Sequence, residues 1–295
     1  MRSWSSSIRR LGARSDQSSC ASRAPGTARS DALWCSTVGL PALQQPFVDL
    51  GKAIYQSTNG SFFTANVITQ GAPINGNEKW RPSLTRGVVQ ARPLAVTPNG
   101  ASEPALFVGD QLGYGYRLGS GTGAITWTSN GGVALGQVIQ APAVFANRAN
   151  ANAAFQAKYT SDVVFFGTRN NTAGTNSVSG LRADTGASVF TWQPGGLGQI
   201  VGAMAFDYGT NTLWVPSLGA TSLQVVNALD ATAAPLLSVS DLGPLPGGVV
   251  ANGVLREVLV ASQTGVVRGY GTTTRVKSWE VATGQAITAP LVTFG

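Results

Sequence analysis

A strand–turn–strand unit recurs along this chain of 295 residues and limits its possible folds more than any other feature. The clearest copy runs from Val178 to Trp192, where a strand-like segment leads into Asp184-Thr-Gly186 and an aromatic segment follows. A glycine adopts a positive φ angle at little cost, so Gly186 suits a chain reversal. Because Asp184 and Thr185 can hydrogen-bond the turn backbone, we predict a tight turn here between two strands.

Four further copies align with this turn. The residues in the place of the turn glycine are Gly76, Gly123, Ala233 and Gly284. With Gly186 included, successive turns lie 47, 63, 47 and 51 residues apart. The long spacing exceeds the shortest by 16 residues, which is the length of an Asn/Ala-rich stretch at 146–161. We interpret this stretch as an insertion that contains at most a short helical turn.

Each repeat contains four short strand-like segments. One apolar run precedes the turn in each of four copies, at 105–109, 162–167, 212–215 and 257–261. Another precedes each of those, at 93–96, 142–145, 202–206 and 248–251. A period of 40–50 residues that holds four strands is typical of a β-propeller blade. The sequence therefore predicts an all-β propeller of about five four-stranded blades, at 46–84, 91–131, 141–196, 201–241 and 248–294.

The N-terminal segment 1–32 differs in composition from the rest of the chain. Its first 30 residues contain six arginines and one aspartate, and so carry +5 of the formal net charge of +7. We expect 1–32 to be a disordered or wrongly started basic tail and 33–295 to be the propeller domain. Since the positive charge belongs to the tail, it does not predict a nucleic-acid surface. No signal peptide is recognisable, because the arginines precede no apolar segment, and no run of 18 apolar residues predicts a membrane span.

The segment 33–38, around Trp34, resembles the last strand of a blade. One interpretation is that it closes the ring by pairing into the 248–294 blade, since propellers protect their strand edges in this way. A closed propeller would be a stable monomer. The other interpretation is that the chain is a fragment of a larger propeller. The sequence leaves both open.

Three of the turns resemble the PQQ-like propeller repeat, which has the approximate form Ala-x-Asp-x-x-Thr-Gly-x-x-x-Trp. They are Asp184-Thr-Gly186 with Trp192, Thr122-Gly123 with Trp127, and the segment 280–284. The resemblance covers about 250 residues. It implies the propeller of quinoprotein alcohol dehydrogenases and of BamB-type outer-membrane-assembly lipoproteins, with each tryptophan docked between neighbouring blades. It also implies a location outside the cytoplasm, in the periplasm or at the cell surface.

The copies depart from the family pattern at single positions. Gly119 stands where an acidic residue is expected in the first copy, and Thr288 stands where the tryptophan is expected in the last. In the central copy Phe190 holds the tryptophan's position, and Trp192 lies two residues further on.

The residue types argue against most catalytic chemistry. The chain has no histidine, which excludes His-based triads, His-ligated zinc and c-type haem attachment. No two acidic residues lie within four positions of each other, so no local calcium loop is present. The segment Gly119–Gly123 lacks the Lys-Ser/Thr of a phosphate-binding loop. We therefore assign no catalytic residue, no metal ligand and no cofactor, and cofactor-binding residues remain unknown.

Two further residue sets have structural and functional interpretations. Tryptophans recur once per blade, and this spacing favours blade packing over a quinone or sugar site. They are Trp80, Trp127, Trp192 and Trp279. Cys20 and Cys35 could form a disulfide in an oxidising compartment, but the sequence does not decide whether they pair.

The sequence favours a non-catalytic propeller that works outside the cytoplasm as a protein-binding or assembly module, without settling whether the protein is an enzyme. The expected partner is a protein or a surface polymer. One alternative is a fragment of a PQQ-dependent quinoprotein dehydrogenase, although the chain lacks the adjacent cysteine pair that several of those enzymes carry. Another alternative is a cell-surface propeller that binds glycans.

Overall fold

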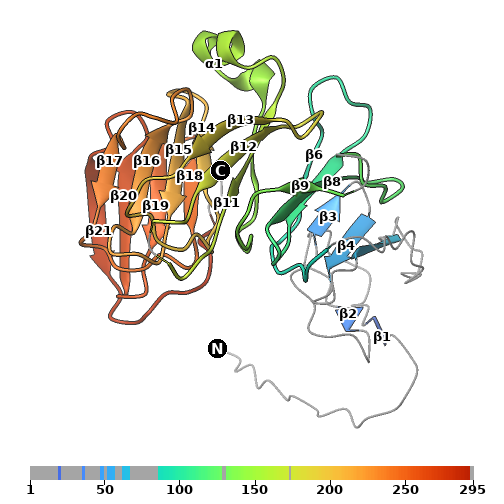
Figure 1. Cartoon of the computed structure of the whole chain (residues 1–295). Coiled ribbons are helices and arrows are strands. Elements are labelled where there is room, and N and C mark those ends of the chain that lie inside the picture. Colours follow the sequence, from blue (N-terminus) through green and yellow to red (C-terminus); the bar gives the residue numbers. More distant parts are fainter. Residues whose placement is uncertain are drawn as a thin grey trace.

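The computed structural model describes residues 86–127, 131–172 and 174–292, together with the backbone of five short strands nearer the N-terminus. Within these residues the chain forms four antiparallel sheets of four strands, each built from consecutive strands. Figure 1 shows the sheets side by side in chain order, which is the arrangement of propeller blades. The predicted all-β propeller fold is confirmed.

The four sheets match four of the five expected blades. The first contains β6 (Leu94–Val96), β7 (Ala105–Gly109), β8 (Tyr114–Gly119) and β9 (Val133–Ala134). The second contains β10 (Val144–Ala146), β11 (Val163–Gly167), β12 (Val178–Arg182) and β13 (Ser188–Trp192). The third contains β14 (Ala205–Asp207), β15 (Thr212–Pro216), β16 (Leu223–Asn227) and β17 (Leu237–Val239). The last contains β18 (Val249–Asn252), β19 (Glu257–Ala261), β20 (Val266–Gly271) and β21 (Lys277–Ala282).

The expected blade at 46–84 corresponds to a three-stranded antiparallel sheet. It is formed by β3 (Phe47–Asp49), β4 (Lys52–Gln56) and β5 (Phe62–Asn66). The rest of that segment, Trp80 included, lies outside the described residues.

The closing strand expected at 33–38 is not found in the last blade. Strand β2 (Cys35–Ser36) pairs with β1 (Ser19–Cys20), and the β18–β21 sheet contains no fifth strand. Cys20 and Cys35 are direct partners in the β1–β2 register. Trp34 and the two cysteine side chains lie outside the described residues, so the disulfide stays a prediction.

The central turn has the predicted conformation. Gly186 has a φ angle of +77°, and its amide donates to the carbonyl oxygen of Arg182 at 2.8 Å. The amide of Thr185 donates to Asp184 Oδ1 at 2.8 Å. Gly123 repeats this arrangement: its φ angle is +68°, and its amide donates a hydrogen bond to the carbonyl oxygen of Gly119 at 2.7 Å.

The position assigned to the last turn was wrong. Gly284 follows β21, whereas the turn between β20 and β21 lies at 271–275. There Arg275 takes the glycine's place. Its φ angle is +59°, and its amide donates a hydrogen bond to the carbonyl oxygen of Gly271 at 2.8 Å. The turn was missed because it carries no glycine at the left-handed position. The correction places Trp279 four residues after the turn, as Trp127 follows Gly123.

One blade boundary also moves. The blade expected at 91–131 extends to β9, which ends at Ala134. Trp127 is buried but lies before β9 and outside the strand ladder.

The blades pack face to face, and their second strands show this most clearly. Every residue of β7, β11 and β15 is buried. A neighbouring sheet covers each face of β11 and β15, whereas β7 packs on the next blade with one face and on Val89 and Ala91 with the other. This explains why these strands are nearly continuous apolar runs without polar alternation. In β19 burial alternates along the first four residues, which indicates that one face of the last blade is not covered.

Backbone hydrogen bonds join each blade to the next at equivalent places. The amides of Ile139, Ile200 and Leu245, in the segments that lead into the next blade, donate to carbonyls of the preceding blade at 2.9, 3.0 and 3.1 Å. After the last blade, the amide of Ile287 makes the same bond to the carbonyl of Ser262 at 3.1 Å. The accepting residues follow the second strand of each blade, are at most 1% exposed, and carry a polar side chain. They are Asp110, Thr168, Ser217 and Ser262. This polar position, which the sequence analysis missed, belongs to the repeat as much as the turn does.

Candidate binding site

The insertion at 146–161 forms a short helical layer between β10 and β11. It contains a 3₁₀-helix at Arg148–Asn150 and helix α1 at Ala153–Lys158, which stands clear of the sheets in Figure 1. An asparagine caps each helix, as Asn147 Oδ1 accepts from the amide of Ala149 at 2.8 Å and Asn152 Oδ1 from that of Ala154 at 3.0 Å. The short helical turn expected in the insertion is confirmed.

The insertion is fixed to the following blade by apolar and polar contacts. The Phe155 side chain is fully buried and packs edge-on against Phe206, with ring centroids 5.4 Å apart. Tyr159 Oη donates to the carbonyl of Ala228 at 2.5 Å. Burial raises the pKa of Tyr159 to about 12, so the phenol keeps its proton at neutral pH. These contacts fix the insertion against the following blade, so it forms one wall of the site described next.

A cavity of about 190 Å³ lies beside this wall, where two blades meet. Three segments enclose it: the β6–β7 loop, the insertion, and the turn between β12 and β13. The lining residues are Pro98, Asn99, Arg148, Thr160, Ser161, Asp162, Ala183 and Asp184.

Asp162 joins two of these segments. Its carboxylate is 4% exposed, and it accepts from the amide of Arg148 at 2.7 Å and from the amide of Asn99 at 2.6 Å. Its own carbonyl accepts from the amide of Ala183 at 2.9 Å. Both carboxylate oxygens are thus engaged, and we assign Asp162 the role of holding the pocket in shape.

Arg148 supplies a cationic group to the pocket. Its Nε donates to the carbonyl of Tyr159 at 2.6 Å, and one terminal nitrogen donates to the carbonyl of Gln156 at 2.9 Å. Among the described residues no carboxylate forms an ion pair with this guanidinium. The remaining N–H groups and the charge can therefore serve a ligand that offers a carboxylate or carbonyl oxygen.

Asp184 borders the same pocket from the central turn. Arg182 binds its carboxylate in a bidentate manner, at 3.1 and 2.7 Å. This hydrogen-bonded pairing lowers the pKa of Asp184 and keeps the carboxylate ionised at neutral pH. Asp184 is half exposed and already paired, so it sets the polarity of the rim without presenting an unsatisfied charge.

Trp127 contacts the pocket residue Ala183 and packs two blades together. It is fully buried, and its Nε1 donates to the carbonyl of Ala183 at 3.3 Å. Its ring contacts Phe107 and Phe166, at centroid distances of 5.5 and 6.3 Å. The packing role expected for the blade tryptophans is thus confirmed for Trp127.

Trp192 and Trp279 differ in burial. Trp192 is 2% exposed and belongs to the core between the second and third of the four-stranded blades. Trp279 is 38% exposed, and its contact with a following blade is absent from the described part of the chain. The segment 119–123, which lacks the residues of a phosphate-binding loop, is a turn enclosed by the bridge between Leu118 and Ile125.

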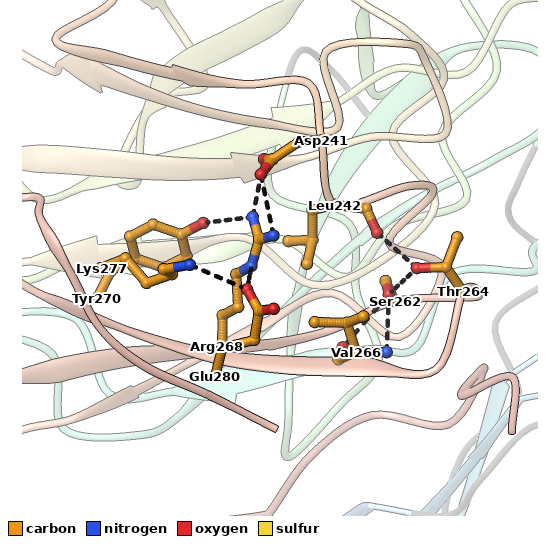
Figure 2. Close-up of polar contacts among 9 residues, drawn as sticks. All are labelled: Asp241, Leu242, Ser262, Thr264, Val266, Arg268, Tyr270, Lys277 and Glu280. Atoms are coloured by element: carbon orange, nitrogen blue, oxygen red, sulfur yellow. Dashed lines mark hydrogen bonds and ion pairs between the residues drawn. The ribbon is translucent and has the colours of Figure 1, made fainter. Parts of the chain in front are cut away.

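A second polar cluster, shown in Figure 2, joins the last two blades. The Arg268 side chain is 8% exposed and donates to both oxygens of Asp241, at 2.8 and 3.0 Å, and to Glu280. Beside it, Thr264 Oγ1 donates to the carbonyl of Leu242 at 2.8 Å. Arg268 is almost buried and its charge is compensated by Asp241 and Glu280. We therefore interpret this cluster as a contact that holds the two blades together and not as a ligand site.

The sequence analysis identified Asp184 as a turn residue but missed Arg148 and Asp162 as pocket residues. The signal that could have found them is the 16-residue excess in the repeat spacing, because both flank or belong to the insertion. In the described ranges no three His, Cys, Asp or Glu side chains gather to hold a metal ion. No helix found there is long and apolar enough to cross a membrane.

Comparison with known proteins confirms the architecture. No protein-family model and no curated protein matches the sequence. Among solved structures, BamB from Moraxella catarrhalis is similar, with 17% identity, a TM-score of 0.56, and coverage of 88% of this chain and 68% of that one. Saccharomyces cerevisiae Sqt1 shares 10% identity with a TM-score of 0.64, covering 88% and 67%. The C-terminal WD40 domain of Sif2 shares 10% identity with a TM-score of 0.55, covering 84% and 60%.

All three solved structures are β-propellers. The chain spans only 60–68% of their length, and identities of 10–17% carry the fold alone. The chain has the β-propeller fold, and BamB is a propeller of the PQQ-like type that the repeats resemble.

Proposed function

We propose that this protein is a non-catalytic propeller that binds a protein partner at the pocket beside the insertion. The observation that carries the proposal is Arg148, which lines a cavity at a blade junction and whose guanidinium forms no ion pair with a carboxylate among the described residues. Insertions in repeat proteins often mark the binding face. The insertion supplies three of the lining residues.

The size and chemistry of the cavity favour a partner's side chain over a cofactor. Its volume of about 190 Å³ lies below the roughly 300–1,000 Å³ of typical small-molecule sites. The available donors are the remaining N–H groups of Arg148 and the hydroxyl of Thr160, since Ser161 Oγ already donates to the carbonyl of Asp162 at 3.1 Å. They suit an acidic side chain or a chain-terminal carboxylate on the partner.

The proposed location is outside the cytoplasm, in the periplasm or at the cell surface. It is supported by the resemblance of the turns to the PQQ-like repeat and by the structural likeness to BamB. Labelling of intact cells with a membrane-impermeant reagent tests it. Protection of the protein from the reagent until the cells are lysed contradicts it.

Site-specific photo-cross-linking tests the binding site. A photoreactive phenylalanine analogue replaces Thr160, an exposed pocket residue, in the full chain expressed in its host. The control position is Ala220, exposed in the β15–β16 loop, which lies at the opposite end of the strands. We expect a discrete protein adduct from position 160 and none from 220. Equal adducts from both, or none from 160, contradict the proposal.

A pair of arginine variants ties that adduct to the pocket. Arg148→Gln should abolish the adduct from position 160, because the guanidinium that binds the partner is gone. Arg256→Gln removes an exposed arginine from the β18–β19 turn and should leave the adduct unchanged. Retention of the adduct in the Arg148 variant would mean that the pocket is not the binding site.

A reconstitution experiment separates this function from the quinoprotein alternative. Purified protein is incubated with pyrroloquinoline quinone and calcium, and alcohol-dependent reduction of a dye is measured. A bound-quinone spectrum with dye reduction would overturn the non-catalytic assignment. A glycan array tests the other alternative, a cell-surface propeller that binds glycans, and specific binding to a glycan would favour it.

A further inference from the structure

The outer face of the last blade carries the side chains that the other blades use to pack against a neighbour. Strand register defines one row of residues across each blade. In the last blade this row is Val250, Leu259, Gly269 and Trp279. In the 144–192 blade the equivalent row is Val144, Phe165, Gly180 and Phe190.

The equivalent rows in the preceding blades are covered by the next sheet. Phe165 and Phe190 are 0% and 4% exposed, and they belong to the same apolar cluster as Phe206 and Leu213 of the following blade. In the 205–239 blade, Trp214 and Val225 occupy these positions. Both are fully buried in a cluster with residues of β18–β20.

The last row is not covered in the same way. Trp279 is 38% exposed and Val281 is 54% exposed, and every other residue of β21 is exposed as well. Leu259 and Val267 are half-buried, whereas Phe165 at the position of Leu259 is fully buried. The face that meets no sheet in the described chain therefore carries an apolar residue on each of its four strands.

Local contacts make this face flat. A side chain at Gly269 would meet the Trp279 indole at 2.4 Å, so the indole lies across the glycine and presents its other face outward. Trp279 Nε1 donates to Glu257 Oε2 at 3.1 Å. Trp127 instead donates to the next blade, at the carbonyl of Ala183. The Trp279 donor is satisfied within its own sheet, so covering the ring leaves the indole N–H paired.

We propose that this face, made of Val250, Leu259, Val267, Trp279 and Val281, binds a second copy of this chain. Continuity with the existing contacts supports a β-sheet as the occupant, since each described blade-to-blade contact pairs two sheet faces. A second copy supplies such a face. The chain's own β3–β5 sheet lies at the other end of the row of blades in Figure 1, beside β6–β9.

The size of the face sets the strength of this association. Four strands spaced about 4.8 Å apart, each of about five residues, give a face of roughly 19 by 17 Å, or about 320 Å². Two such faces fall well below the roughly 1,200–2,000 Å² of stable interfaces. The association is therefore expected to be weak and reversible.

Sedimentation velocity of the full chain over roughly 1–100 µM tests the proposal. We expect reversible, concentration-dependent association of the wild type. Val281→Lys should weaken it at least about tenfold, because the lysine charge is buried on association. Val254→Lys is the matched control, since Val254 is 79% exposed and lies in the β18–β19 turn.

The outcomes separate clearly. Loss of association in Val281→Lys with retention in Val254→Lys supports the proposal, provided that thermal melts show both variants folded. If Val281→Lys fails to fold, Trp279→Arg replaces it. A wild type that stays monomeric over the whole range overturns the proposal, as does association that neither face variant weakens. The test is independent of the pocket and of its partner.

Discussion

Replacement of Trp127 by alanine tests how the blades are held together. The indole is fully buried between two blades, and it packs against Phe107 and Phe166. Truncation of a buried Trp to Ala typically costs about 3–5 kcal/mol, since it removes buried apolar surface and leaves a cavity. A small share, about 1 kcal/mol, belongs to the hydrogen bond with the Ala183 carbonyl. We expect Trp127→Ala to lower the free energy of unfolding by about 4 kcal/mol.

Urea unfolding followed by far-ultraviolet circular dichroism measures this loss by linear extrapolation. Trp127→Phe should lose less, because a ring still fills most of the site. Trp279→Ala is the control, since Trp279 is 38% exposed and no following blade covers it in the part of the chain that the structure describes. It should cost only about 1–2 kcal/mol. A loss below about 1 kcal/mol for Trp127→Ala, or one no larger than that of the control, would refute the packing role.

Three further predictions follow from single contacts. In urea unfolding, Gly186→Ala should destabilise the protein by about 2 kcal/mol or more and Gly284→Ala by about 1 kcal/mol, since both glycines have positive φ angles. The first loss is larger because only the Cβ at position 186 meets a buried indole, at 2.9 Å, and equal losses would contradict this. Arg268 hydrogen-bonds two carboxylates and holds their pKa values below the usual range, so its stabilisation is present above about pH 4 and is lost as pH falls further. Arg268→Leu should therefore flatten the loss of stability between about pH 5 and 3, and an unchanged pH profile would argue against the ion pairs. Tyr159→Phe should cost about 1 kcal/mol by removing the bond to the Ala228 carbonyl, and no loss in thermal or urea unfolding would mean that the insertion is not anchored there.

The fold was largely predictable because the same buried strands and tight turns recur in each repeat. A second strand that is buried on both faces must be apolar throughout, so the segment 105–109 could be located to the residue. The segment 257–261 was located equally well from its apolar residues, although β19 is buried mainly on one face. The central turn could be predicted because Gly186 has a positive φ angle that glycine favours.

The last turn shows where such reasoning fails. Arg275 adopts the same left-handed conformation as Gly186, but a positive φ angle at arginine leaves no trace in the residue type. Glycine at 284 was the stronger signal, and it belongs to the loop after β21. Local sequence therefore placed the turn nine residues too late.

The pocket could not be predicted from residue types. Arg148 and Asp162 are brought to Asp184 by the pairing of β10, β11 and β12 within one blade, although they are separated in sequence by 36 and 22 residues. The preceding blade completes the pocket with Pro98 and Asn99. No local motif encodes that meeting. Only the insertion length marked the region as unusual.

Hydroxyl-radical footprinting of the dilute, monomeric protein tests the central claim that each blade's row of side chains is covered by the next blade and that the last row is open. The oxidation rates of the four tryptophans in the described blades are compared in one experiment. The account predicts rapid oxidation of Trp279, which is 38% exposed, and slow oxidation of Trp127, Trp192 and Trp214, which are at most 2% exposed. Oxidation of Trp127 or Trp214 as fast as that of Trp279 would contradict the stacking of the blades. Protection of Trp279 equal to that of the other three would show that its face is already covered in the monomer.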